Sequence, residues 1–209
     1  MALQLTVVTP EGQVFDEAVE HVEFNHDQLA LAVINSHVRH ELSQGEYAIR
    51  RQRCESVSKT LGLESLRDLT WSMLEQSRGQ LDDLSFLCAE HVVRENERTL
   101  NFVQYMKNSD WLQAGEMLYQ SHASLREKFQ VSCIELDGLV EFARELGPEG
   151  GVLGARMTGA GFGGSVIVLA EREKASNVVS KIVEDYNQIG ATLARPRASG
   201  FVAEPTAGA

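Results

Sequence analysis

A glycine-rich stretch near residue 160 constrains the fold of this chain more than any other feature. Four glycines fall within six positions, Gly159-x-Gly161-x-Gly163-Gly164, just before the apolar run 166–170. Glycine loses more backbone freedom on folding than any other residue, so such a dense run is costly. Either the backbone turns through positive φ here, or a ligand or another segment approaches the main chain too closely for a Cβ.

The glycine spacing differs from that of the best-known phosphate loops. A Walker A loop needs a Lys followed by Ser or Thr after its glycines, and none is present. The pattern also differs from the Gly-x-Gly-x-x-Gly fingerprint of dinucleotide-binding folds. Backbone N–H groups in a loop of this kind can still bind phosphate oxygens. On glycine content alone, a plain hairpin or bulge and a ligand loop remain equally open.

The sequence around this loop predicts an α+β fold. Strands are expected at 29–34, 151–157, 165–170 and about 200–204, and helices at 47–61, 81–106, 110–129, 134–146 and 173–189. Asp110 is suited to cap the start of the helix at 110–129. This order of strand, helices, two strands, helix and strand is that of the ferredoxin-like split β-α-β fold. The helices between residues 45 and 130 would be an insertion that covers one side of the sheet.

The chain is expected to consist of a short N-terminal segment and one main domain. Residues 1–28 have the pattern of a β-hairpin, with a turn at Pro10-Glu11-Gly12, and residues 29–209 form the main domain.

Bulk properties exclude several classes of function. The formal charge of −11 argues against nucleic acid or an anionic membrane as a partner. The longest apolar run is far shorter than the roughly 18 residues of a membrane span, and no signal peptide is apparent, so a cytoplasmic protein is expected. Cys54, Cys88 and Cys133 are widely spaced and form no CxxC pair. Buried, reduced thiols are therefore expected, with no metal site.

A second informative stretch begins at Asn35 and continues into a basic helix. Tyr47 stands at the mouth of that helix, where it can pack or can donate its hydroxyl to a sugar, and packing fits the bare sequence better. Ile49, Cys54, Val57 and Leu61 have the spacing of the buried face of this helix. The remaining arginines, Arg50, Arg51 and Arg53, are most simply a solvated face paired with Glu46 and Glu55.

Three separated motifs resemble the galactokinase branch of the GHMP small-molecule kinases. Residues 156–164 read Arg-Met-Thr-Gly-Ala-Gly-Phe-Gly-Gly, which is similar to the third, C-terminal motif of that branch. Residues 35–55 are similar to its pattern Asn-Ser-x-Val-x-His-x-Leu, then Glu-Tyr-x-x-Arg-Arg, then Cys-Glu. A third agreement covers 121–126 and 131–137. The resemblance runs from about residue 29 to the C-terminus and identifies 29–209 as a GHMP kinase C-terminal domain.

The resemblance implies an enzyme that transfers the γ-phosphoryl group of ATP to the anomeric C1 hydroxyl of galactose, with Mg²⁺. Tyr47, Gly159, Ala160 and Gly161 would then contact the sugar. The phosphate-side loop would comprise Thr158, Phe162, Gly163, Gly164 and Ser165. The hydroxyls of Thr158 and Ser165 are expected to bond the loop backbone rather than a substrate. Structural roles are expected for His37, His40, His91 and His122.

Motifs of the N-terminal half of that family are missing. The sequence has no Gly-Arg-x-Asn-x-x-Gly-Glu-His-x-Asp sugar motif, no ATP-phosphate loop and no Met-Asp-Gln block with the catalytic aspartate. No catalytic residue is therefore assigned, and the chain is expected to be inactive without a separate N-terminal half. The surface that packs on that half would be exposed and prone to self-association.

Two alternatives stay open: a non-catalytic, sugar- or ATP-sensing homologue, and a structural module whose glycine loop binds nothing. N-acetylgalactosamine is an alternative sugar.

Overall fold

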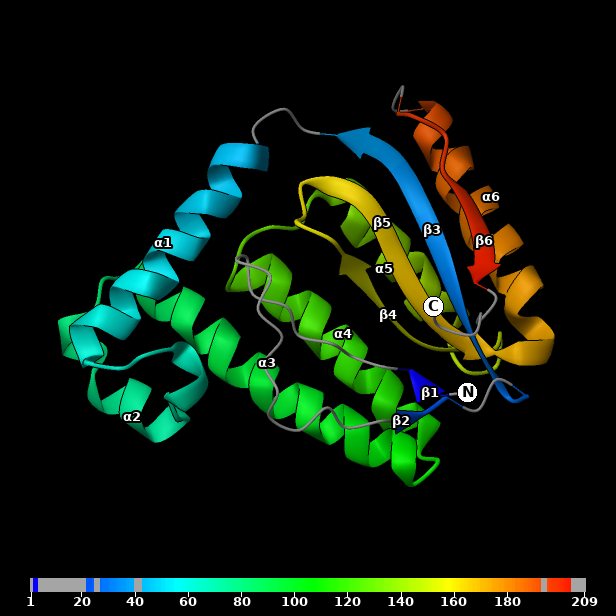
Figure 1. The fold of residues 1–209 in the computed structure, drawn as a ribbon. Helices are drawn as coiled ribbons and strands as arrows, with labels where there is room; N and C mark the ends of the chain where they lie inside the picture. The colour runs from blue at the N-terminus through cyan, green and yellow to red at the C-terminus, as the bar shows by residue number, and fades with distance from the viewer. Residues whose placement is uncertain (1, 4–21, 25–26, 40–42, 193–194, 204–209) are drawn as a thin grey trace.

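The computed structural model describes residues 2–3, 22–24, 27–39, 43–192 and 195–203. Its centre is a four-stranded antiparallel sheet with the strand order β4-β5-β3-β6 (Figure 1). The strands are β3 (Leu29–Arg39), β4 (Val152–Thr158), β5 (Gly163–Glu171) and β6 (Ser199–Ala203). The first and third of them along the chain are central, and a helix joins the third to the fourth. The predicted ferredoxin-like α+β fold is therefore confirmed.

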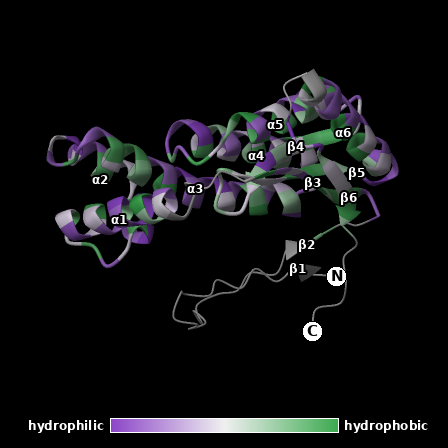
Figure 2. Ribbon diagram, turned by 90° about the horizontal axis from the view of Figure 1, so that it is seen from above, coloured by the Kyte–Doolittle hydropathy of each residue, from purple (hydrophilic) through white to green (hydrophobic). Residues whose placement is uncertain are grey.

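One face of this sheet is closed by two helices. Side chains alternate along a strand, and on β3 Ala30, Ala32 and Ile34 point to the same face and are fully buried. They pack against α5 (Ile134–Leu146) and α6 (Ala175–Thr192) in the largest hydrophobic cluster. Figure 2 shows both helices on the same side of the sheet. The intervening residues of β3 point to the opposite face and are only partly buried.

Four helices of the described residues lie between β3 and α5, and two of them begin at capping aspartates. They are α1 (Ser43–Leu61), α2 (Trp71–Gln76), α3 (Asp83–Lys107) and α4 (Trp111–Glu127), with short 3₁₀ turns at Leu66–Asp68, Arg78–Gln80 and, after β5, Arg172–Lys174. The Asp82 carboxylate accepts hydrogen bonds from the first turn of α3, and Asp110 accepts one from the Gln113 amide at the start of α4. Both are N-caps, and the Asp110 cap was expected from sequence.

The expectation that the whole helical insertion covers the sheet is wrong. α1 and α2 pack on the first half of α3, around a separate cluster that contains Val57, Leu74 and Val93. In Figure 1 they lie to the left, away from the strands. Because α1 rests on α3 rather than on the sheet, Val57 is fully buried, whereas Ile49, which was expected on the same face, is exposed.

α4 lies against the edge strand β4 at a contact between two glycines. A Cβ added to Gly115 would lie 1.9 Å from the Leu153 carbonyl oxygen, and one added to Gly154 would lie 2.2 Å from the Gly115 oxygen. Only glycine permits such an approach of helix and strand backbones. α4 therefore packs directly on β4.

The N-terminal part is described only at its ends. β1 (Ala2–Leu3) pairs antiparallel with β2 (Val22–Glu23), and Phe24 is buried against a cluster with Leu29 and Met106. The rest of the hairpin predicted within residues 1–28 lies outside the described residues, so the boundary at residue 28 stays a prediction. Among the helices that the structure describes, none combines the length and apolar content that crossing a membrane requires.

Candidate functional site

The glycine loop joins β4 to β5 with an unusual backbone. Positive φ angles occur at Gly159 (84°), Gly161 (90°), Phe162 (58°), Gly163 (124°) and Gly164 (89°). A Cβ disfavours this left-handed region, so the density of glycines follows from the path of the chain. Phe162 is the exception, and its ring packs against the main hydrophobic cluster.

The loop also contains a close backbone contact and two open positions. A Cβ at Gly161 would lie 2.1 Å from the Val131 carbonyl oxygen, whereas a Cβ at Gly159 or Gly164 would meet no atom within 4 Å. Gly161 therefore needs to be glycine for two reasons: its positive φ and the close approach of the Val131 backbone. At Gly159 and Gly164 the space beside the backbone is free for a ligand.

Three hydrogen bonds anchor the loop to the rest of the domain. The Phe162 amide donates to the Val131 carbonyl (2.8 Å), and the Ser36 hydroxyl donates to the Gly164 carbonyl (2.9 Å). Before the loop, the Met157 amide donates to His122 Nδ1 (3.3 Å). In these bonds the hydroxyl comes from Ser36 on β3, and the expectation that Thr158 and Ser165 bond the loop backbone stays a prediction.

His122 connects this anchor to the partly buried carboxylate of Asp137. Because Nδ1 accepts from Met157, the neutral ring carries its proton on Nε2, which lies 3.2 Å from Asp137 Oδ1. Ser132 donates to the same oxygen at 2.5 Å. Burial tends to raise the pKa of Asp137, but the hydrogen bonds from His122 and Ser132 outweigh it and lower the pKa. His122 thus has the structural setting that the sequence predicts.

Polar side chains from four strands form a row beside the loop. Strand pairing sets Thr158 opposite Ser165, Ser165 opposite Asn35, and Asn35 opposite Ser199. Directly opposed residues of antiparallel strands share a face, so these side chains lie together on the face away from α5 and α6. All four are partly or fully exposed, and His37 Nε2 lies 2.7 Å from the Ser199 hydroxyl. The row can donate and accept hydrogen bonds with a polar ligand.

Sequence reasoning missed Ser199 altogether and gave Asn35 no role. The two residues meet only through the register of β3 and β6, which no local signal in the sequence reveals.

Tyr47 lies on the second turn of α1 with 47% of its surface exposed, so it is not a core residue. One turn later, Arg50 donates from Nε to the Phe129 carbonyl (2.8 Å) and pairs with Glu46 (3.1 Å). With its side chain only 14% exposed, Arg50 does not belong to a solvated face as expected. α1 and the glycine loop are thus both bonded to the segment 129–131. Within the described residues, Tyr47 itself makes no hydrogen bond to the loop.

The other candidate groups have protein partners. His91 is buried, stacks on Phe129 and lies 2.8 Å from the Ser124 hydroxyl, and burial lowers its pKa to about 4. Burial raises the pKa of Cys54 to about 12 and of Cys133 to about 11, which favours the protonated form of both free thiols. Only Cys88 is fully buried, however. No three His, Cys, Asp or Glu side chains gather as a metal site in the described ranges. His40 lies outside them.

Comparisons with known proteins give a consistent result. Residues 102–188 match the family model described as GHMP kinases C terminal. The chain is 43% identical to a galactokinase of Thermotoga petrophila over 169 residues, which are 81% of this chain and 46% of that protein. It is 41% identical to the galactokinase of Homo sapiens over 165 residues, or 79% of this chain and 41% of that one. The resemblance predicted from the three motifs is confirmed.

Solved structures agree with this result. The chain superimposes on Lactococcus lactis galactokinase complexed with galactose with a TM-score of 0.79 and 30% identity, over 91% of this chain and 48% of that one. Mevalonate kinase of L. major, with a TM-score of 0.52 and 18% identity, shares the fold alone. The chain therefore spans about half the length of the relatives that it matches.

Proposed function

We propose that this chain, whose residues 102–188 match the family model described as GHMP kinases C terminal, is the C-terminal half of a galactokinase-type enzyme. The complete enzyme would transfer the γ-phosphoryl group of ATP to the C1 hydroxyl of galactose. The relatives named galactokinase, and the chain's coverage of only about half of each, support this proposal. The half described here would be inactive by itself, and a cytoplasmic location is part of the same proposal.

The observation that carries the proposal is the open backbone of the glycine loop beside the polar row. Gly159 and Gly164 leave room where a Cβ would stand. A sugar hydroxyl and a phosphoryl group can meet at bonding distance only if nothing bulky separates them. Main-chain amides can then stabilise charge that develops on phosphoryl oxygens.

The proposed roles divide along the loop. Gly159, Ala160 and Gly161 face the sugar, and the phosphate side comprises Thr158 and the residues 162–165. Tyr47, half-exposed on α1, offers an aromatic surface for the apolar face of the sugar ring and a hydroxyl for its polar rim. These groups orient the substrates, and none of them acts as the base for the sugar hydroxyl.

The use of ATP and Mg²⁺ by the complete enzyme is proposed from the resemblance to the family. ATP supplies the phosphoryl group when it is bound. The loop offers backbone and hydroxyl groups that suit phosphate oxygens. Mg²⁺ is commonly held by one or two carboxylates together with the phosphates of the substrate.

The test is ADP release by the purified chain with Mg-ATP and galactose, alone and with the N-terminal half of Lactococcus lactis galactokinase added. Activity is expected only with both halves. Gly159→Val, which fills the open space, should abolish it, while the helical variant Gly138→Ala should not. Repeating the assay with N-acetylgalactosamine in place of galactose shows which of the two sugars is phosphorylated. Galactose binding without ADP release in either mixture would instead indicate a sensing homologue.

A further inference from the structure

The glycine loop depends on its surroundings for a fixed shape. Gly159, Gly161, Gly163 and Gly164 all have positive φ, and glycine permits many other backbone conformations as readily. Groups that orient a substrate or stabilise developing charge must be held in place before the reaction begins. The residues that bond the two sides of the loop therefore decide whether it is ready to act.

Asp137 is connected to the strand that enters the loop. Its Oδ1 atom lies 3.2 Å from His122 Nε2, and His122 Nδ1 accepts the Met157 amide. The ring can accept this bond only when Nδ1 carries no proton. A carboxylate beside Nε2 favours that form, because it keeps the proton on Nε2. The His122 side chain is only 4% exposed, so Asp137 rather than water sets its tautomer.

Asp137 is also connected to the segment on which the loop rests. Ser132 donates its hydroxyl hydrogen to the same Oδ1 atom at 2.5 Å. The preceding residue, Val131, accepts the Phe162 amide with its carbonyl at 2.8 Å. One carboxylate thus reaches the loop both at its entry, through the Met157 amide, and in its middle, through the Phe162 amide.

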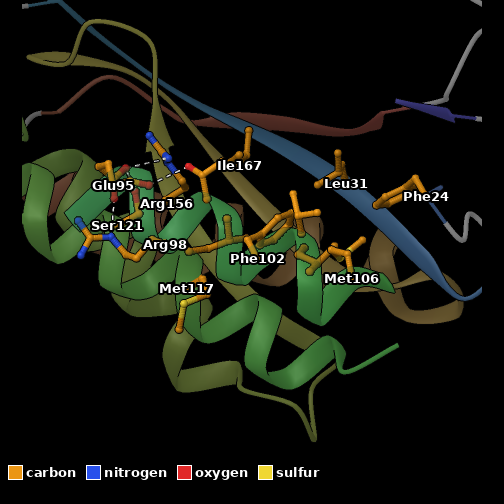
Figure 3. Close-up of a pocket in the computed structure, with 14 residues that line it drawn as sticks. Phe24, Leu31, Glu95, Arg98, Phe102, Met106, Met117, Ser121, Arg156 and Ile167 are labelled. Atoms are coloured by element: carbon orange, nitrogen blue, oxygen red, sulfur yellow. Dashed lines mark hydrogen bonds and ion pairs between the residues drawn. The ribbon is translucent and has the colours of Figure 1, made fainter. Parts of the chain in front are cut away.

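A second support holds the carbonyl of Met157 and does not involve Asp137. Arg156 donates from Nε to this carbonyl (3.0 Å), and its Nη1 lies 3.5 Å from a carboxylate oxygen of Glu95. Ser121 donates to the same oxygen at 2.6 Å. Figure 3 shows this group at the polar end of a cavity of about 320 Å³ whose other walls are mainly apolar. The amide bonds, not the carbonyl bond, therefore report on Asp137.

The place of Asp137 in the fold suits this role. It lies in the first turn of α5, where the helix dipole favours a negative charge. Because α5 packs on the sheet face opposite to the polar row, the carboxylate acts on the loop through other residues.

We propose that Asp137 is a positioning residue for phosphoryl transfer. Its carboxylate fixes the entry of the glycine loop through His122 and the middle of the loop through Ser132. This inference rests on the proposed function, and it adds to the site a residue that contacts neither the sugar nor the phosphate. Without this support, the loop amides lose their alignment with the reacting groups.

The first test is amide hydrogen exchange of the purified chain, measured by NMR at Met157 and Phe162. Asp137→Ala should accelerate exchange at both amides by about tenfold or more, because both lose their support. Asp137→Asn keeps an acceptor oxygen and should restore most of the protection. Glu141→Ala is the matched control, since this exposed carboxylate lies one turn further along α5. It should change neither amide.

Two variants of His122 test the connection to Met157 separately. Counted in bonds from Cβ, the side-chain oxygen of Asn stands where Nδ1 stands in His, and the amide nitrogen of Gln stands where Nε2 stands. His122→Asn keeps the acceptor for Met157, so exchange there should stay slow. His122→Gln keeps the donor to Asp137 but removes that acceptor, so exchange should accelerate at Met157 and not at Phe162. This pair decides the question if circular dichroism shows that Asp137→Ala does not fold.

The second test is ADP release by this chain mixed with the N-terminal half of Lactococcus lactis galactokinase. Asp137→Ala should lower kcat by about tenfold or more and change the KM for galactose by less than about threefold, because the loop is misaligned while the sugar still binds. Asp137→Asn should restore most of kcat.

The outcomes separate the positioning role from the proposed function. Unchanged exchange at both amides, or acceleration that extends equally over β3 and β5, would overturn the positioning role. An unchanged kcat in Asp137→Ala would overturn it as well. A wild-type mixture that releases no ADP would overturn the proposed function, whereas the exchange experiment, which uses this chain alone, would still show whether Asp137 holds the loop.

Discussion

Gly159 and Gly161 have nearly the same φ but opposite surroundings. Gly161 lies against the Val131 carbonyl, and Gly159 has open space. We expect Gly161→Ala to cost about 3 kcal/mol or more, because it adds a steric overlap to the backbone strain. Gly159→Ala should cost about 1–2 kcal/mol, from strain alone. Urea denaturation of both variants measures the difference, and equal losses would show that the contact with Val131 is not maintained.

His91 predicts a pH dependence of stability. Its pKa falls from 6.5 to about 4 on folding because burial disfavours the charged ring. Below pH 6.5 the unfolded chain therefore binds a proton that the folded chain does not. The stability present above pH 6.5 should fall by about 3 kcal/mol as the pH decreases to 4.

The comparison between wild type and His91→Phe isolates this effect, because phenylalanine keeps the stacking on Phe129 and cannot titrate. Denaturation midpoints measured from pH 7 to pH 4 should decline less steeply for the variant. Parallel declines would assign the acid sensitivity to other groups.

The contact between α4 and β4 depends on the absence of side chains at Gly115 and Gly154. Gly115→Ala must separate the helix from the strand, and we expect a loss of about 3 kcal/mol or more. Gly138→Ala is the control, because Gly138 lies in α5 with no atom within 4 Å of an added Cβ. That change should stabilise the protein by about 0.5–1 kcal/mol. Thermal unfolding gives both values, and a tolerated Gly115→Ala would contradict the close packing.

The elements were largely predictable from sequence because their signals are local. Helix α5 begins and ends at the expected residues, Ile134 and Leu146, and Asp110 caps α4 as predicted. Packing partners were less predictable. The periodicity of α1 indicates a buried stripe but does not say whether α3 or the sheet covers it. The row from Thr158 to Ser199 was likewise unpredictable, because it depends on strand register.

The described residues form three hydrophobic clusters, and the long helix α3 contributes to two of them, through Val93 beside α1 and α2 and through Met106 beside Leu29. Leu74 is fully buried in the cluster formed by α1, α2 and the start of α3, and Leu139 is fully buried under the sheet. Leu74→Ala should cost about 2–5 kcal/mol and should loosen mainly the helical region. Hydrogen exchange should then accelerate in α1 and α2 while β3 and β5 stay protected. Leu139→Ala is the comparison and should accelerate exchange in the sheet. Uniform acceleration in both variants would indicate a single cooperative unit.

Three consecutive backbone carbonyls, from Phe129 to Val131, accept hydrogen bonds from both α1 and the glycine loop. Arg50 of α1 donates to the first two, and the Phe162 amide of the glycine loop donates to the third. Because these bonds follow one another along the chain, we expect a substitution on α1 that moves Arg50 to shift Val131 and the loop amide bonded to it.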